Sequence, residues 1–499
     1  MKKFYITTTL PYVNAPPHIG FALEIVQADV IARYHAILGD EVFFNTGTDE
    51  HGLKIYQKAI EEKRDPQEYC DECAQKFDLL KEKLNLSYNN FIRTTDEHHL
   101  AACQEFWKRC EKNGDIYRKN YKTKYCVGCE LEKTESELVD GKCPIHPNRE
   151  LEIIEEENYF FKFSKYQKPL LDLYDKNKDF VIPVHRQKEI YNFVKNGLQD
   201  FSISRLKTKM PWGVPVPGDD DHVMYVWFDA LINYISCLDW PENGKKFEEF
   251  WGTTKKPNAI QVAGKDNLRQ QTAMWQAMLL SAGLPSSKQV FIHGFINLEG
   301  QKISKSPSAS PSLSPSLPSP IGLVDKYGID AVRYYLLRGI PSYEDGEFSI
   351  QRFEELYNSD LANGLGNLVA RVVSMIEKYD LRKVVSKDRV DTKYKEHIDG
   401  GKGVAIDLLN RFELFESLEV IWRLMGYTGD RYAANNYIDI EKPWELAKTD
   451  KKKLEQVLSN LLYCISEIAD LIAPFLPETS EKIKKQLKTG KSEILFPRI

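Results

Sequence analysis

Two short motifs, each placed after an apolar segment, constrain the fold of this chain more than any other feature. The first is PHIG at residues 17–20, which follows the apolar segment 4–8, and the second is KISKS at residues 302–306, which follows segment 290–294. Apolar residues recur at helical spacing after the first motif, and a second strand-like segment comes at 42–45. This strand–helix–strand order predicts a parallel sheet that binds ligands at the carboxyl ends of its strands.

Length and composition exclude several classes of protein. A chain of 499 residues is long enough for three or four domains, and 42% hydrophobic with 28% charged residues is ordinary for a globular protein. The net charge of −5 argues against nucleic-acid binding by bulk electrostatics, so an RNA-binding role requires local basic faces, for which the lysine clusters at 451–453 and 482–491 are candidates. With no signal segment and no apolar run of membrane-spanning length, we expect a cytoplasmic protein without membrane contact.

The pattern of segments predicts an α/β protein with an insertion and a helical C-terminal region. Residues 1–116 and 223–320 alternate strand and helix patterns, with further strands expected at 225–228 and 259–263, and we assign them to the two halves of one Rossmann-type domain. Residues 117–222 form a turn-rich connective insertion, and residues 321–350 form a linker. Residues 351–499 have long amphipathic patterns without strand runs, which predicts a helix bundle.

Four metal-type residues in the insertion predict a structural zinc site. Cys126 and Cys129 form one C-x-x-C pair, and Cys143 and His146 form a second pair thirteen residues later. Three thiolates and one imidazole fill a tetrahedral site and leave no open position, which is typical of structural zinc. The alternatives are unliganded thiols or disulfides in an oxidising compartment. The nine unevenly spaced cysteines favour reduced thiols, and the pair Cys70-x-x-Cys73 is expected to be buried in a helix.

The two motifs, in this order, resemble the HIGH and KMSKS motifs of class I aminoacyl-tRNA synthetases, and the surrounding residues resemble the methionine-specific members, whose zinc knuckle the cluster also matches. The resemblance covers essentially the whole chain. It implies a ligase that activates an amino acid with ATP and Mg²⁺ and loads it onto tRNA. Catalysis is then mainly positioning and electrostatic stabilisation, with the helix N-terminus at His18 and the cations Lys302 and Lys305 acting on the phosphates.

The resemblance also implies three sets of binding residues. The ATP site is expected to consist of His18, Gly20, Gly264, Asp266, His293, Gly294 and Lys305. The methionine site is expected to consist of Leu10, Tyr12, Asp49, Trp227, Ala230, Leu231, Tyr234 and Gln261, with Asp49 pairing with the α-ammonium group. The anticodon site is expected to consist of Asn367, Arg371 and Trp444, of which the first two share one helix face; an ordinary helix face with one packed tryptophan is the alternative.

Three features depart from the family pattern. Phe21 stands where the family usually has a second histidine, and Gln261 stands where it commonly has a histidine near the methionine side chain. The Ser/Pro-rich segment 307–320 cannot form a regular helix and is expected to be disordered or extended, so it bears on closure of the lysine loop.

Two alternatives to a methionine enzyme remain open from the sequence. A leucine or isoleucine synthetase would carry a large editing insertion, and the insertion at 117–222 is short for one. A catalytically weak tRNA-binding protein would result if the segment after Ser306 spoils the lysine loop. For the methionine enzyme, the partners are ATP, L-methionine and initiator and elongator tRNA(Met). Because the oligonucleotide-binding domain that dimerises some family members is not seen in the sequence, we expect a monomer.

Overall fold

The centre of the protein is a six-stranded parallel sheet with the strand order β3-β2-β1-β14-β15-β7. The computed structural model describes residues 1–129, 131–133, 137–298, 301–302, 319–426 and 428–499. The sheet strands are β1 (Lys3–Thr8), β2 (Glu41–Thr48), β3 (Asn90–Arg93), β7 (Val181–Ile182), β14 (Ala259–Gly264) and β15 (Gln289–His293). Every residue of β14 is buried, as expected for a strand covered on both faces. The predicted parallel α/β fold is therefore confirmed.

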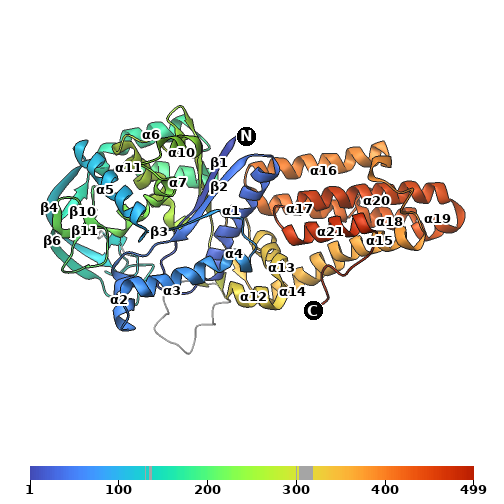
Figure 1. Cartoon of the computed structure of the whole chain (residues 1–499), viewed down its shortest axis with the longest axis horizontal. Coiled ribbons are helices and arrows are strands. Elements are labelled where there is room, and N and C mark those ends of the chain that lie inside the picture. The colour runs from blue at the N-terminus through green and yellow to red at the C-terminus, as the bar shows by residue number, and fades with distance from the viewer. Residues whose placement is uncertain (130, 134–136, 299–300, 303–318, 427) are drawn as a thin grey trace.

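Helices cover both faces of this sheet, and the most buried of them begins at the PHIG motif. They are α1 (Ile19–Ile37), α2 (Leu53–Glu61), α3 (Pro66–Asp78), α4 (Leu80–Lys83), α5 (Glu97–Lys112), α10 (Gly244–Phe250) and α11 (Trp275–Ser281). Apolar residues occupy nearly all sides of α1, because the helix lies between the sheet and the C-terminal helices (Figure 1). In α3 the Asp65 carboxylate caps the N-terminus, and Cys70 and Cys73 are buried as predicted.

The inserted region consists of two small antiparallel sheets and a helical segment. The first sheet has the order β5-β4-β6-β8 and contains β4 (Ile116–Cys126), β5 (Leu131–Lys133), β6 (Glu152–Phe161) and β8 (Phe201–Ser202). The second contains β9 (Ser204–Leu206), β10 (Pro215–Val216) and β11 (Asp219–Met224). Between β6 and β8 of the first sheet, α6 (Gln167–Lys176) and α7 (Val184–Lys195) flank β7, which pairs with β15. Part of the range 117–222 thus completes the main sheet, and the domain boundaries stay a prediction.

One predicted strand is wrong. Residues 225–228 are not a strand: β11 ends at Met224, and the chain turns into α8 (Val226–Ala230) and then α9 (Asn233–Ser236). The amide of Phe228 donates to the carbonyl oxygen of Tyr225, which closes the first helical turn. A short run of large apolar residues has no period that separates a strand from a buried helix, so only the tertiary packing decides the outcome.

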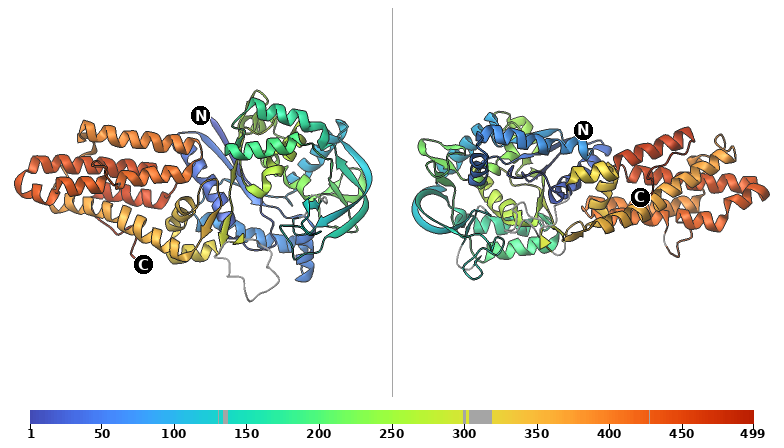
Figure 2. Two further views of the ribbon diagram at one scale, coloured as in Figure 1. Left: turned by 180° about the vertical axis from the view of Figure 1, so that it is seen from behind. Right: turned by 90° about the horizontal axis from the view of Figure 1, so that it is seen from below.

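Residues 351–499 form helices joined by loops, and the described residues of this range contain no strand, which confirms the predicted bundle. The helices are α14 (Ile350–Leu356), α15 (Asn367–Lys378), α16 (Thr392–Asn410), α17 (Leu414–Met425), α18 (Ala434–Glu441), α19 (Pro443–Thr449), α20 (Lys451–Leu471) and α21 (Pro477–Thr489). They extend to one side of the α/β part, and α19 lies at the far end (Figures 1 and 2). The connection carries α12 (Pro320–Tyr327), α13 (Ile329–Tyr334) and a small sheet of β16 (Ile296–Leu298), β17 (Gln301–Lys302) and β18 (Gly346–Phe348).

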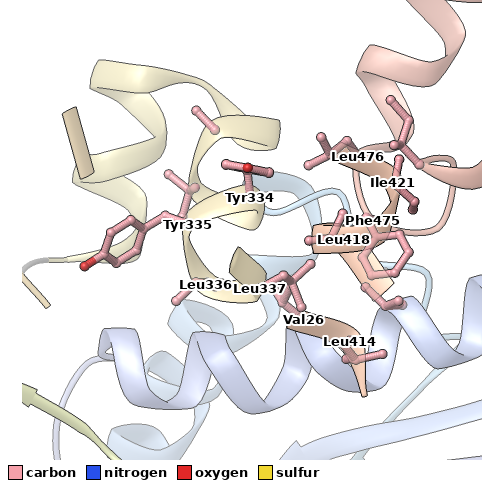
Figure 3. Packing of buried hydrophobic residues seen from close by; sticks show 14 of the residues in the cluster. Val26, Tyr334, Tyr335, Leu336, Leu337, Leu414, Leu418, Ile421, Phe475 and Leu476 are labelled. Atoms are coloured by element: carbon pink, nitrogen blue, oxygen red, sulfur yellow. The ribbon is translucent and has the colours of Figure 1, made fainter. Parts of the chain in front are cut away.

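The bundle docks on α1 through an apolar contact with a buried ion pair beside it. Val26 of α1 packs in the same core cluster as Leu337, Leu418 and Phe475 (Figure 3). Arg333, fully buried, donates to Asp29 of α1 at 2.7 Å and to the backbone carbonyls of residues 474 and 475. The α1 helix therefore connects the PHIG motif at its start with the bundle near its middle.

Two further expectations concern cysteines and membranes. All nine cysteines are free thiols. In the part of the chain that the structure describes, none of the helices combines the length and apolarity required to cross a bilayer.

Candidate functional site

The predicted ligand-binding residues gather where the sheet strands end. Because β1, β2, β14 and β15 are parallel, their carboxyl ends share one edge of the sheet. The segment after β1 reaches this edge with Leu10 and Tyr12, Asp49 directly follows β2, and β14 and β15 end at Gly264 and His293. This edge is where α/β sheets bind nucleotides.

His18 is the N-cap of α1, and its imidazole is oriented by the helix itself. The Nδ1 atom of His18 accepts a hydrogen bond of 3.0 Å from the amide of Gly20. A neutral imidazole that accepts at Nδ1 carries its hydrogen at Nε2, so the outward nitrogen is a donor. A Cβ at position 20 would lie 3.0 Å from Cε1 of His18, and glycine therefore leaves the space that the ring occupies. The arrangement suits an anion at the helix N-terminus.

Phe21 turns away from this edge into the core. Only 8% of its surface is exposed, and its ring packs edge-to-face on Phe77 of α3 with the ring centroids 5.5 Å apart. The ring of Phe21 is therefore part of the core and not of the ligand-binding edge.

Glu24, a residue that sequence reasoning missed, joins three strand ends. One carboxylate oxygen accepts from the amide and hydroxyl of Thr9, at 2.7 and 2.6 Å. The other accepts from the amide of Gly264 at 3.2 Å and from Nε2 of His293 at 3.1 Å. Burial lowers the pKa of His293, but the hydrogen bond and charge of Glu24 outweigh it and raise the pKa above its ordinary value. The only signal for this role was an acidic residue inside an otherwise apolar helix.

The glycines of the predicted ATP site lie where a side chain would clash. A Cβ on Gly264 would lie 2.9 Å from a carboxylate oxygen of Asp266, and a Cβ on Gly294 would lie 2.2 Å from the backbone of Glu344. Gly294 also accepts from Nδ1 of His293 at 2.7 Å through its carbonyl oxygen. The backbone at these positions is therefore close-packed.

Three chain segments bring the residues of the predicted methionine pocket together: the segment after β1, the segment after β2, and α8 with α9. Tyr12 pairs with Asp49 as an isolated parallel bridge, and its ring meets Trp227 edge-on with the centroids 6.4 Å apart. Leu10, Leu231 and Tyr234 share one apolar cluster, while Ala230 is buried on α8. Asp49 is almost fully buried, at 3% exposure.

A buried acid–base pair, which sequence reasoning also missed, joins the two walls of this pocket. Nδ1 of His51, two residues after Asp49, lies 3.2 Å from Oδ2 of Asp229, which precedes Ala230. Burial raises the pKa of Asp229, and the charge of His51 opposes that rise. The pair links the segment that carries Asp49 to the helix that carries Trp227.

Gln261 is a buried residue of β14, and its side chain is hydrogen-bonded within the protein. Its Nε2 donates to Oε1 of Gln271 at 2.9 Å, and Nε2 of Gln271 donates to the hydroxyl of Tyr234 at 2.7 Å. Gln261 is thus connected to Tyr234 through Gln271. Sequence reasoning missed Gln271 as well, because this residue lies in a helix with no chemical motif around it.

The structure describes the lysine motif only in part. Lys302 ends β17, which pairs with β16 in an antiparallel ladder, and its side chain lies outside the described parts. Lys305 and the Ser/Pro segment 307–318 lie outside the described residues. The base of the motif is held by Asp345, which pairs with Lys265 at 2.7 Å and accepts from the amide of Phe295 at 2.9 Å.

The four residues of the predicted zinc site converge. The side-chain ligand atoms of Cys126, Cys129, Cys143 and His146 all lie within 4.8 Å of one another, so the cluster could hold a metal ion. A Cβ at Gly128 would lie 2.5 Å from Cγ of His146, and only glycine therefore admits the imidazole beside the first cysteine pair. The donor set and this cradle fit a tetrahedral, closed metal site.

The predicted anticodon residues lie on the bundle. Asn367 is exposed at the start of α15, and the guanidinium of Arg371 contacts Asn435 and Asp439 of α18 at 3.4 and 3.3 Å. Trp444 is 43% exposed at the start of α19, directly after α18. The three side chains are therefore on helices that follow or contact one another at the outer part of the bundle.

Comparison with known proteins connects both parts of the chain to one family. The family model described as class I tRNA synthetases (M) matches residues 4–152 and 135–373, and the model of the anticodon binding domain of methionyl tRNA ligase matches residues 430–497. The methionine–tRNA ligase of Thermotoga maritima is 42% identical over 97% of this chain and 75% of its own length. That of Nostoc is 42% identical over 98% of this chain and 90% of its own length.

Solved structures agree with this result. The crystal structure of Mycobacterium tuberculosis methionyl-tRNA synthetase bound by methionyl-adenylate has a TM-score of 0.88 and 36% identity, and covers 97% of this chain and 94% of that one. The apo form from the same organism has a TM-score of 0.83 and 32% identity, over 100% of this chain and 98% of that one. The chain therefore belongs to the methionine-specific family of class I tRNA synthetases, as the two motifs and the predicted fold indicated.

Proposed function

We propose that the protein is a methionine–tRNA ligase, which activates L-methionine with ATP and transfers it to the 3′ end of tRNA(Met). In the first step a carboxylate oxygen of methionine attacks the α-phosphorus of ATP, pyrophosphate leaves and methionyl-adenylate forms. In the second step a ribose hydroxyl of the tRNA attacks the carbonyl carbon, and AMP leaves. The observation that carries the proposal is the convergence of the α1 N-terminus and the pocket of Tyr12, Asp49 and Trp227 at one sheet edge.

The residues act mainly by positioning charge. His18 donates from Nε2 to phosphate oxygens, while the amides at the start of α1 and the helix dipole favour the same charge. Lys302 and Lys305 neutralise the pyrophosphate as it leaves. Asp266 accepts from the ribose hydroxyls beside Gly264, and the backbone at His293 and Gly294 faces the adenine. Asp49 pairs with the α-ammonium group of methionine inside the pocket lined by Leu10, Tyr12, Trp227, Ala230, Leu231 and Tyr234.

Two metal ions belong to the proposal. Cys126, Cys129, Cys143 and His146 would hold Zn²⁺, which would order the knuckle as a structural ion. Mg²⁺ bound to ATP would shield the charge of the phosphates. Lys54 connects the knuckle to the pocket, since its ammonium donates to the Gly128 carbonyl at 2.7 Å and lies over the Tyr12 ring.

For tRNA, we propose that Asn367, Arg371 and Trp444 read the anticodon, by hydrogen bonds and by stacking on the indole. The same anticodon occurs in initiator and elongator tRNA(Met), so both are substrates. The protein acts as a monomer in the cytoplasm, where these tRNAs are used.

Exchange of labelled pyrophosphate into ATP tests the proposal. We expect exchange with methionine and none with leucine or isoleucine. His18→Ala should slow exchange about 10²- to 10³-fold, the loss typical of one donor to developing charge, and Trp444→Ala should leave exchange unchanged while lowering aminoacylation of tRNA(Met). Exchange with leucine or isoleucine instead of methionine would assign a different synthetase. If neither methionine, leucine nor isoleucine supports exchange while tRNA still binds, the protein is a tRNA-binding protein without synthetase activity.

A further inference from the structure

One carboxylate joins the two loops that form the proposed adenosine site. Asp345 accepts from the Lys265 ammonium at 2.7 Å through Oδ2 and from the Phe295 amide at 2.9 Å through Oδ1. Lys265 begins the turn after β14, and Phe295 lies in the segment after β15. Asp345, which is 50 positions beyond Phe295 in the chain, therefore connects the carboxyl ends of two neighbouring strands.

The position of Asp345 is set by its backbone. The amide of Gly346, the next residue, donates to the carbonyl oxygen of Phe295 at 2.9 Å, and β18 continues from there in parallel pairing with β16. Burial raises the pKa of Asp345, but the hydrogen bonds from Lys265 and from the Phe295 amide outweigh it and hold the pKa below its ordinary value. The carboxyl group is therefore ionised at neutral pH.

An aromatic ring holds Lys265 from a second side. The Lys265 ammonium lies 4.5 Å from the centroid of the Phe295 ring, and 26% of the lysine side chain is exposed. A cation over an aromatic face is attracted by the quadrupole of the ring. The ion pair with Asp345 and the contact with Phe295 therefore restrict the lysine side chain to one direction.

Asp266, the proposed ribose-binding residue, follows Lys265 in the same turn. This turn covers Lys265–Asn267 and comes directly after Gly264, the last residue of β14. Asp266 is exposed, and Nδ2 of Asn267 donates to its Oδ1 at 3.3 Å from within the turn. The direction of the Asp266 carboxylate therefore depends on the backbone of the turn, which Lys265 connects to Asp345.

We propose that Lys265 and Asp345 are positioning residues for ATP, which together fix the turn after β14 so that the Asp266 carboxylate meets the ribose hydroxyls. This inference rests on the proposed function. A hydrogen bond weakens steeply when its distance or angle departs from the preferred geometry. Loss of the ion pair therefore weakens the contact with the ribose, while the contacts with the phosphates and with methionine stay as they are.

Discrimination between ATP and 2′,3′-dideoxy-ATP, which lacks both ribose hydroxyls, tests the proposal in methionine-dependent pyrophosphate exchange. Lys265→Met removes the charge and keeps an unbranched apolar side chain beside Phe295. We expect the ratio of kcat/KM for ATP over dideoxy-ATP to fall about two- to tenfold, the range for loss of one hydrogen bond, with KM for methionine unchanged. Lys265→Arg keeps the charge and should retain most of the ratio. A lysine that acts on the phosphates directly would lower both kcat/KM values alike, and the ratio would not change.

Two further substitutions test the connection between the ion pair and the ribose. Asp345→Asn keeps an acceptor for the Phe295 amide but loses the charge that pairs with Lys265, so it should lower the ratio by a similar factor. It also preserves the test if Lys265→Met unfolds. Asp266→Ala should lower the ratio by removing the contact itself, and the addition of Lys265→Met to this variant should lower the ratio no further, because both changes affect one contact.

Lys246→Met is the matched control. Lys246 pairs with Asp239 at 2.8 Å, its side chain is likewise 26% exposed, and its ammonium lies 4.9 Å from the centroid of the Phe43 ring. Phe43 is near the start of β2, away from the ligand-binding edge, so the ratio in Lys246→Met should match that of the unaltered protein.

The outcomes separate the inference from the proposed function. An unchanged ratio in both Lys265→Met and Asp345→Asn would overturn the inference, as would an equal fall in Lys246→Met. Failure of the unaltered protein to exchange with methionine would instead refute the proposed function.

Discussion

Replacement of Arg333 by methionine should detach the helical bundle from the α/β part and cost a large share of the stability. The side chains of Arg333 and Asp29 are both fully buried, and their N–O distance is 2.7 Å. Arg333 also donates to the carbonyl oxygens of Leu84, Pro474 and Phe475, at 3.1, 3.0 and 2.8 Å. The substitution therefore leaves one buried carboxylate with less compensation and three carbonyls with fewer donors.

The expected loss of stability in Arg333→Met follows from the burial of the ion pair. Removal of one partner of a buried ion pair typically costs about 3–5 kcal/mol, since the remaining charge stays out of water. Asp29 keeps its bond to Arg33 at 2.8 Å and those from Ser87 at 2.6 Å, so we expect the lower half of that range, about 3 kcal/mol. The same substitution at Arg423, whose pair with Glu419 is solvent-exposed, should cost less than about 1 kcal/mol.

Low pH should remove the difference in stability between the unaltered protein and Arg333→Met. Burial raises the pKa of Asp29, but the charges of Arg333 and Arg33 outweigh it and hold the pKa below its ordinary value. A carboxyl with a lowered pKa stabilises the fold above its unfolded pKa of about 3.9 and loses that contribution as the pH falls through the folded pKa. The gap between the unaltered protein and Arg333→Met should therefore be full at pH 7 and shrink below about pH 4.

Urea unfolding, followed by near-ultraviolet circular dichroism, measures the gap at each pH, with Arg423→Met as the matched control. Asp29→Asn, alone and combined with Arg333→Met, completes a double-mutant cycle. The double variant should be more stable than the sum of the single losses predicts, because it also removes the buried carboxylate that Arg333→Met leaves with less compensation. Equal losses for Arg333→Met and Arg423→Met, or a gap that does not change between pH 7 and pH 3, would refute the reasoning.

Three further predictions concern the metal cluster, the strand-end carboxylate and the core. Cys143→Ser should reduce bound zinc from one ion per chain to none, as measured by elemental analysis, and retention of a full equivalent would contradict the four-ligand site. Glu24→Gln should lower the pKa of His293, because it removes the hydrogen bond and the charge that oppose the effect of burial most strongly. The pair stabilises the fold below the unfolded pKa of His293 and loses its effect as pH rises through the raised pKa, and an NMR titration that finds His293 unchanged would exclude the coupling. Phe21→Ala should lower the free energy of unfolding by about 3–5 kcal/mol, because it leaves a cavity beside Phe77. Urea unfolding measures this loss, and a loss under about 1 kcal/mol would show that the ring does not belong to the core.

The main features of the fold were predictable because they depend on local patterns. The βαβ order, the helix after PHIG, the zinc-type spacing and the helical region after residue 351 all come from periodicity or from ligands close in the chain. The segment 225–228 shows the limit, since its large apolar side chains fit a strand and a buried helix equally well. The edge strand β7 shows another: two residues within the insertion join the main sheet only through pairing with β15, and nothing in their neighbourhood indicates that partner.

The residues that sequence reasoning missed share a different property, which is that each acts through a partner far away in the chain. Glu24 meets His293 across 269 positions, and Arg333 meets Phe475 across 142. A motif can predict that His18 and Lys302 matter, because the chemistry of those residue types is visible without a partner. A carboxylate or a glutamine in an apolar helix has no such meaning until the fold brings a second polar group to it. Because a buried polar side chain is costly without a hydrogen bond, a carboxylate inside a mostly apolar helix predicts a distant partner even where the sequence does not identify that partner. Glu24 and Asp29 of α1 both satisfy this rule.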